Sequence, residues 1–174
     1  MNKTVIKKEP LSFQEVSLIL DATKHFPHLV YVGPRTWSRF DNIYKIYDGG
    51  SFSGVCAVNT KGRYAKIGPF VLLPHMHGKG LGKALFQKIV NDFRSSHYLY
   101  VASSNHAVIH ITERVGFIEY NNLLNIPFQI WIIYQKMSWK VLWAGEFPSF
   151  IQELMRKTKM AKRERLRHYY LPKY

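Results

Sequence analysis

Apolar residues recur along this chain with two different spacings, and these spacings predict the order of its secondary-structure elements. Apolar positions three or four residues apart indicate helices, whereas β-branched and aromatic runs bounded by turn residues indicate strands. Helices are predicted over residues 13–23, 80–94 and about 105–116. Strands are predicted over residues 4–8, 42–47, 52–58, 64–73, 98–102, 117–120 and 128–137. The stretch between residues 24 and 41 is predicted to be irregular.

Two local motifs support this assignment. Ser12 followed three residues later by Glu15 matches a capping box, so a helix is expected to begin at about Phe13. Asp48-Gly49-Gly50 between two strand patterns predicts a hairpin turn, because glycine tolerates the positive φ that such turns require. The first part of the chain is therefore expected to be a strand and a helix followed by a meander of strands.

Composition adds a domain count and an electrostatic preference. The 174 residues, 47% hydrophobic and 15% aromatic, predict one folded domain with a sizeable core. With 25 Lys and Arg against 11 Asp and Glu, the net charge is +14, which favours attraction to polyanions. Nucleic acid, phosphate-bearing ligands and an anionic membrane surface are all candidates, alongside a basic surface that only keeps the protein soluble.

The same sequence bears on compartment. Cys56 is the single cysteine, so no intramolecular disulfide can form, which fits a reducing compartment. The first residues hold no long apolar run that would indicate a secretory signal. No uncharged apolar run approaches the roughly 20 residues that a bilayer-spanning helix needs. We therefore expect a cytoplasmic protein.

The most informative stretch spans residues 71–86. An apolar run ends at Pro74, a short glycine-rich segment follows, and apolar residues then recur at helical spacing. This order predicts a strand, an anion-binding loop and a helix, because glycine lets backbone N–H groups approach an oxyanion and a helix N-terminus attracts negative charge. The spacing fits neither a P-loop nor a dinucleotide-binding fingerprint.

The stretch resembles the acyl-CoA motif of the GNAT superfamily of N-acyltransferases. That motif is Arg or Gln, two residues, a Gly, one residue, and a Gly or Ala, after a strand that ends in Val-x-Pro. His77 stands at the Arg/Gln position, and Gly80 and Gly82 are the two small residues. A second match is the segment 105–117, in which Asn105 and the Gly-Phe pair at its end follow a pattern common in the family. The resemblance covers residues 3–137.

This resemblance implies an α/β (α+β) fold with a mixed, mostly antiparallel sheet of about seven strands flanked by helices. It also implies an N-acyltransferase that moves an acyl group from acetyl-CoA, or another acyl-CoA, to a primary amine in a ternary complex. The implied cofactor-binding residues are those of the strand end, the loop and the second motif: Val71, Leu72, Leu73, His77, Gly78, Lys79, Gly80, Leu81, Gly82, Lys83 and Asn105.

The chain departs from the family where a tyrosine protonates the leaving thiolate, because Thr112 occupies that position. A threonine hydroxyl is a poor general acid, so Thr112 is a weak catalytic candidate that could instead position a water. Phenols from Tyr64, Tyr100 or Tyr134 are alternatives. No metal site is expected, since neither His75-Met76-His77 nor His25-x-x-His28 has further ligands at a suitable spacing.

Residues 138–174 are expected to form a basic helical extension packed on or beside an acyltransferase domain of residues 1–137. One face of its helix is expected to carry the cations Arg156, Lys157, Lys159, Lys162, Arg163 and Arg167. This face could bind DNA or RNA or only be solvated, with membrane binding a third reading. The acceptor hypothesis is therefore a nucleic-acid-linked amine, such as a modified base or aminoacyl-tRNA. A protein or small amine, and a CoA- or nucleic-acid-binding module without turnover, are the alternatives, and the sequence leaves open whether the protein is a monomer or a dimer.

Overall fold

The structure is a computed structural model that describes residues 3–24, 32–160 and 166–173, apart from the side chains of 153 and 156–160. His25 and His28 lie outside these ranges, as do Lys162 and Arg163. The strands are β1 (Thr4–Lys8), β2 (Asn42–Asp48), β3 (Ser51–Lys61), β4 (Tyr64–Leu72), β5 (Tyr98–Ser103), β6 (Ile118–Glu119) and β7 (Arg167–Leu171). The α-helices are α1 (Phe13–Thr23), α2 (Pro34–Trp37), α3 (Leu81–Phe93), α4 (His106–Arg114), α5 (Phe128–Trp143) and α6 (Phe147–Met160). Short 3₁₀ turns are η1 (Pro74–Met76) and η2 (Leu123–Asn125).

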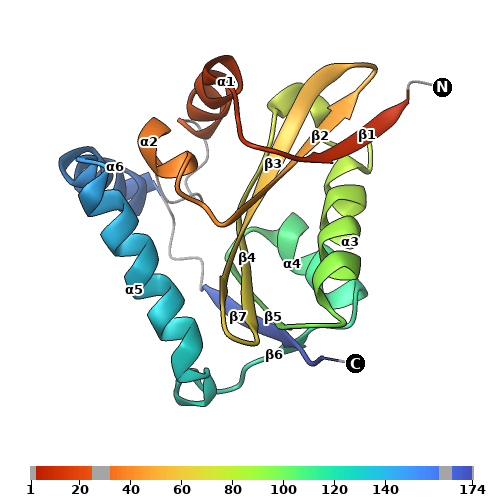
Figure 1. Cartoon of the computed structure of the whole chain (residues 1–174), viewed down its shortest axis with the longest axis vertical. Coiled ribbons are helices and arrows are strands. Elements are labelled where there is room, and N and C mark those ends of the chain that lie inside the picture. The colour runs from red at the N-terminus through yellow and green to blue at the C-terminus, as the bar shows by residue number, and fades with distance from the viewer. Residues whose placement is uncertain (1–2, 25–31, 161–165, 174) are drawn as a thin grey trace.

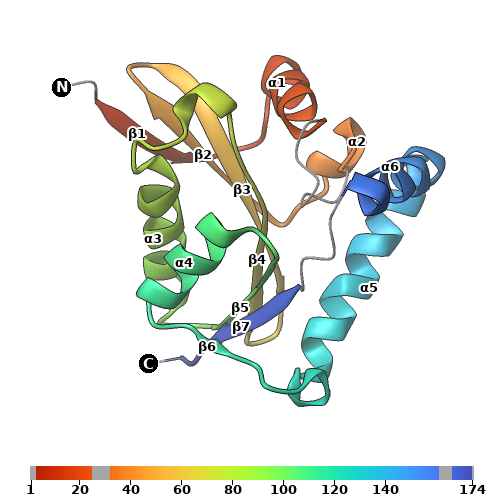
Figure 2. The ribbon, with the colours of Figure 1, turned by 180° about the vertical axis from the view of Figure 1, so that it is seen from behind.

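The strands form one seven-stranded sheet in the order β1-β2-β3-β4-β5-β7-β6. All neighbouring strands are antiparallel except β4 and β5, which run parallel. Helices α3 and α4 cover one face, while α1, α2 and α5 lie over the other (Figures 1 and 2). This is the mixed, mostly antiparallel α/β architecture that the sequence predicts.

The predicted elements before residue 121 are confirmed with small shifts at their ends. The capping box is present, because Ser12 Oγ accepts a hydrogen bond from the Glu15 amide at 3.2 Å and the Ser12 amide donates to Glu15 Oε2 at 2.7 Å. The turn at Asp48-Gly49-Gly50 joins β2 to β3, and both glycines have positive φ. Asn105 caps α4 by accepting from the Ala107 amide at 2.9 Å.

The C-terminal part differs from the expectation. The predicted strand over 128–137 is wrong, because these residues lie in helix α5. The expected boundary between residues 137 and 138 falls inside that helix. The predicted position of Arg167 on a basic helix is also wrong, because it begins strand β7 and lies near Glu113 and Glu119 at 3.9 and 3.7 Å. Strand β7 inserts between β5 and β6, so the end of the chain completes the sheet.

Glu146, between α5 and α6, ties these two helices to the start of α2. Its carboxylate accepts hydrogen bonds from the amides of Arg35 and Thr36 at 2.7 and 3.1 Å and from Thr36 Oγ1 at 2.5 Å. A Cβ at Gly33 would lie 2.2 Å from the Glu146 carboxyl carbon, so only glycine leaves room for this contact. The arrangement holds α5 over the sheet and leaves a space between them.

Among the helices that the structure describes, none has the length and apolar character needed to cross a membrane.

Candidate functional site

The parallel strands β4 and β5 separate in the middle of the sheet. Residues Tyr64 to Ile67 pair with Tyr98 to Val101, and no residue of β4 beyond Ile67 pairs with β5. A shift in the pairing of β3 with β4 lies at the same level, between Cys56 and Val58. Such bulges bend a strand and re-aim its side chains. The edge of β4 from Gly68 to Leu72 that faces away from β3 is therefore open.

A cavity of about 800 Å³ lies at this opening and reaches both faces of the sheet. Its wall comes from the open part of β4, the following glycine-rich loop and the starts of α3 and α4, with α5 and α6 on the other side. A volume of this size is typical of pockets that hold a cofactor or a small-molecule substrate.

The glycine-rich loop presents backbone groups to the cavity. Gly78 and Gly80 have φ values of +78° and +76°, a conformation in which an L side chain is strained. Gly82 is needed for a different reason, because a Cβ there would lie 3.1 Å from Leu72 Cδ1 on β4. Helix α3 begins after Gly80 with no side chain capping its first turn. Its first N–H groups are thus left to bind an anion at the positive end of the helix.

Eight of the eleven predicted cofactor-binding residues line this cavity: Val71, Leu72, His77, Gly78, Gly80, Gly82, Lys83 and Asn105. The ring of His77 contacts β4 directly, with Nε2 3.2 Å from the Leu72 carbonyl oxygen. The structure thus brings the strand end, the loop and the second motif together around one opening.

The other three predicted residues face elsewhere. Leu73 and Leu81 are buried in the core between the sheet and α3. Lys79 Nζ lies 3.5 Å from Met76 Sδ and 3.9 Å from Asp48. These positions support the loop and are not part of the cavity wall.

Thr112 is also absent from the residues that line the cavity. Its side chain is fully buried, and its hydroxyl donates a hydrogen bond to the Val108 carbonyl oxygen at 2.7 Å. The hydroxyl is therefore engaged by its own helix, as threonine often is. Val108 and Ile111 are the α4 side chains that form the wall at this level.

The sheet face below α5 adds Lys66 and Lys140, which the sequence analysis did not single out, to Tyr134, which it named as an alternative phenol. Lys66 of β4, Tyr134 and Lys140 of α5 all line the cavity. The Tyr134 hydroxyl lies 3.4 Å from that of Tyr100, which is 2.5 Å from His168 Nδ1 of β7. Burial raises the pKa of the Tyr134 phenol, so it stays protonated at neutral pH.

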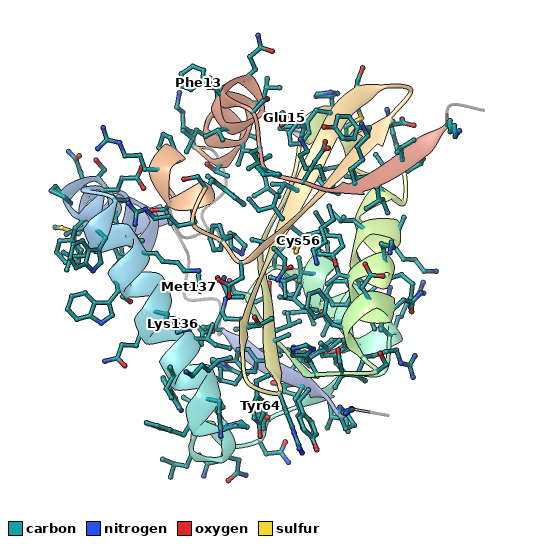
Figure 3. All side chains as sticks on the ribbon, in the orientation of Figure 1. Phe13, Glu15, Cys56, Tyr64, Lys136 and Met137 are labelled. Atoms are coloured by element: carbon teal, nitrogen blue, oxygen red, sulfur yellow. The ribbon has the colours of Figure 1, made fainter. Side chains whose placement is uncertain are left out.

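A signal for α5 was present in the sequence. Its buried residues Ile130, Ile133 and Val141 recur at helical spacing, and Pro127 stands just before its first turn. Met137 on the same helix packs against the core below it, whereas Lys136 is exposed. Figure 3 labels both residues on α5.

No group of three or more metal-ligating side chains occurs among the residues placed by the structure.

Comparison with known proteins identifies the class. The family model of the acetyltransferase (GNAT) family matches residues 14–117, so the chain belongs to this family, which uses acyl-CoA donors. It is therefore an acetyltransferase by family. Among curated proteins, no sequence relative matches the chain.

Solved structures share the fold. The chain is 22% identical to an IAA acetyltransferase from Bacillus cereus ATCC 14579, with a TM-score of 0.54 over 68% of this chain and 79% of that one. N-acetylglutamate synthase from Neisseria gonorrhoeae, complexed with coenzyme A and N-acetyl-glutamate, gives 13% identity and a TM-score of 0.61 over 97% of this chain and 34% of that one. YncA, a putative acetyltransferase from Salmonella typhimurium with acetyl-CoA, is 14% identical to this chain. Its TM-score is 0.53 over 66% of this chain and 80% of that one.

Proposed function

We propose that this protein is an acetyl-CoA-dependent N-acyltransferase whose donor lies in the opening between β4 and β5. The observation that carries this proposal is the convergence of an open strand edge with an uncapped helix N-terminus. The peptide-like pantetheine arm would bond to the free edge of β4 as an added strand does. The pyrophosphate would then lie against the amides of the loop and the first turn of α3.

The loop and α4 contribute separate parts of this donor site. Lys83 is exposed at the cavity wall and supplies a positive charge beside the helix start. Asn105 uses its side-chain oxygen to cap α4, so its side-chain nitrogen is the group that remains to donate to the arm. The donor site of this proposal consists of Val71, Leu72, His77, Gly78, Gly80, Gly82, Lys83 and Asn105.

The chemistry is direct transfer. A neutral amine attacks the thioester carbonyl carbon, the new C–N bond forms, the C–S bond breaks, and the amine loses one proton while the thiolate gains one. Holding both substrates in one cavity accelerates the reaction, because their encounter becomes intramolecular. Tyr134 is the protonated phenol that the cavity wall offers as a proton donor to the thiolate.

The test is release of free thiol from acetyl-CoA across a panel of amines, with CoA binding measured by calorimetry. Acceptor-dependent thiol release supports the proposal. Tight CoA binding without turnover on any amine would favour a CoA-binding module, and absence of CoA binding would overturn the proposal.

A nucleic-acid-linked amine is a second candidate acceptor, favoured by the net charge of +14. Among the cations proposed for that contact, Arg167 is engaged near Glu113 and Glu119, so the contact would rest on the remaining five. Binding of this kind releases counterions and weakens steeply as salt rises. If the affinity for tRNA or duplex DNA does not change with salt concentration, this candidate is removed. Acetylation of proteins or small amines would then be the remaining hypothesis.

Replacing Thr112 with valine is expected to leave the Kd of CoA and kcat within about twofold of the parent, because the hydroxyl is bonded inside its own helix. The cost should appear in stability, at about 1 kcal/mol for the lost hydrogen bond. Steady-state kinetics and urea denaturation check both values. A tenfold fall in kcat with unchanged stability would instead show that the Thr112 hydroxyl takes part in catalysis.

A further inference from the structure

Lys66 is a buried cation in the wall of the cavity. It lies on β4 one residue before the end of the pairing with β5, and 7% of its surface is exposed. The ring of Tyr134 on α5 lies 5.0 Å from Nζ. Within the part of the chain that the structure describes, its ammonium group makes no hydrogen bond or ion pair. Its Nζ is also 3.9 Å from where a Cβ on Gly68 would stand, which places it where β4 leaves β5.

No acidic side chain of the described residues lies in the cavity wall around Lys66. Burial lowers its pKa to about 8, yet much of the population still carries a proton at neutral pH. The wall, as far as the structure places its residues, consists of apolar, neutral polar and basic side chains. A buried charge is costly unless it is paired, and an aromatic face offsets only part of that cost. The free protein therefore holds a cation that a ligand could pair.

A second unused donor lies on the same face of the sheet. Asn59 of β3 is opposite Lys66 in the pairing of β3 with β4. Its Oδ1 accepts from Lys140 Nζ at 2.8 Å, but its buried Nδ2 has no hydrogen-bond partner. Lys140 itself is paired with Asp41. Trp37 Nε1 is likewise buried without a partner, but neither Trp37 nor Asn59 is among the described residues that line the cavity, so the anion site on this face rests on Lys66.

We propose that Lys66 binds an anionic group of the acyl acceptor, so that the preferred substrate is a small amine that also bears a carboxylate. This inference rests on the proposed N-acyltransferase function and adds the substrate class. A carboxylate at Lys66 would pair the buried ammonium and leave the amine of the same molecule free to face the open edge of β4. A cavity of about 800 Å³ suits a donor arm together with a small acceptor.

The experiment compares α-amino acids with the corresponding amino-acid amides, which keep the amine and lose the negative charge. The parent protein should use the acids with kcat/KM about tenfold or more above the amides, as expected for a charge-assisted contact. Lys66→Met should remove this preference by raising the KM for the acids. The kcat/KM for the amides should stay nearly unchanged. Lys66→Arg should restore part of the preference. Lys136→Met is the matched control, because Lys136 is an exposed lysine of α5 that does not line the cavity.

Two further readouts separate the possible failures. The Kd of CoA for Lys66→Met shows whether the donor site is intact, and urea denaturation shows whether the lysine is structural. Removing a buried unpaired charge should raise stability, so a loss of stability would assign Lys66 to the scaffold. Calorimetric titration of the CoA-bound protein with acids and amides decides acid preference even if no amine is acetylated.

Three outcomes would overturn the inference. Turnover with amides equal to that with acids would leave the N-acyltransferase function standing and remove the acceptor class. An equal fall in kcat/KM for acids and amides in Lys66→Met would likewise remove the acceptor class and leave the N-acyltransferase function in place. Stoichiometric acetylation of Lys66 itself, seen by mass spectrometry after incubation with acetyl-CoA, would show that the lysine is an acceptor and not an anion site.

Discussion

Replacing Gly80 with alanine is expected to raise the Kd of CoA by at least about tenfold. Gly80 has a φ of +76° and stands just before the first turn of α3. An alanine there either stays in the left-handed region at a cost of about 1 kcal/mol or rotates to negative φ. Rotation turns the next amides away from the cavity, and each lost hydrogen bond to a charged phosphate is worth about 1.5–3 kcal/mol. Calorimetry with CoA measures the change.

Gly62→Ala is the matched control for this variant. Gly62 lies in the turn between β3 and β4, has a φ of +57°, and has no atom within 4 Å of the Cβ that alanine would add, as is also true of Gly80. Both substitutions therefore carry the same kind of backbone strain. Only Gly80→Ala should weaken CoA binding, and equal Kd values for the two variants would show that the loop amides do not hold the donor.

The glycine-rich loop and the first half of the fold were predictable because their signals are local. The capping box at Ser12 and Glu15 and the glycines of the β2–β3 turn act within a few residues of the structure that they set. The loop could likewise be located from the sequence, since positive φ at Gly78 and Gly80 favours glycine whatever the tertiary context.

The C-terminal half was harder because its structure depends on distant contacts. The run that contains Ile130 and Ile133 is rich in β-branched and aromatic residues, and this composition favours a strand. In the structure, Ile130 and Ile133 lie on one face of a helix, and this face is buried against Tyr100 and Ile126. Strand β7 was missed because its pairing with β5 joins residues about 70 positions apart, for example Tyr100 with Tyr170.

The residues of the cavity also differ in whether a local motif or only the tertiary structure identifies them. The residues of the proposed donor site follow a motif, whereas Lys66 is one lysine in a basic chain and stands out only because it is buried under α5. Because residues 128–137 were predicted as a strand, the sequence did not indicate that α5 covers Lys66, the residue proposed to bind the acceptor. Thr112 shows the converse, since a residue placed by a motif can be engaged within its own helix.

Replacing Glu15 with glutamine is expected to lower the free energy of unfolding by about 2 kcal/mol at pH 7. Its carboxylate lies 3.0 Å from the buried Nζ of Lys45 and accepts from the Tyr47 hydroxyl at 2.6 Å. Removing one partner of a buried ion pair usually costs about 3–5 kcal/mol. The smaller value is expected because Glu9 also lies 2.9 Å from Lys45 and still pairs it. Glutamine keeps the capping interaction, so the variant isolates the charge.

The loss should depend on pH with a defined sign. Burial acts to raise the pKa of Glu15, but hydrogen bonds led by that from Tyr47 outweigh it and hold the pKa below its usual value of 4.5. The carboxylate therefore stabilises the fold above about pH 4.5, and this contribution is lost as the pH falls through the lowered folded-state pKa. Urea denaturation at pH 7 and pH 3 should show a large difference between parent and Glu15→Gln at the higher pH and a smaller one at the lower. Ser12→Ala, which removes the cap at a cost of about 1 kcal/mol without removing a charge, should depend on pH less than Glu15→Gln, because the Ser12 hydroxyl makes only a small contribution to the lowered pKa of Glu15. An equal loss for Glu15→Gln at pH 7 and pH 3 would contradict the ion-pair explanation.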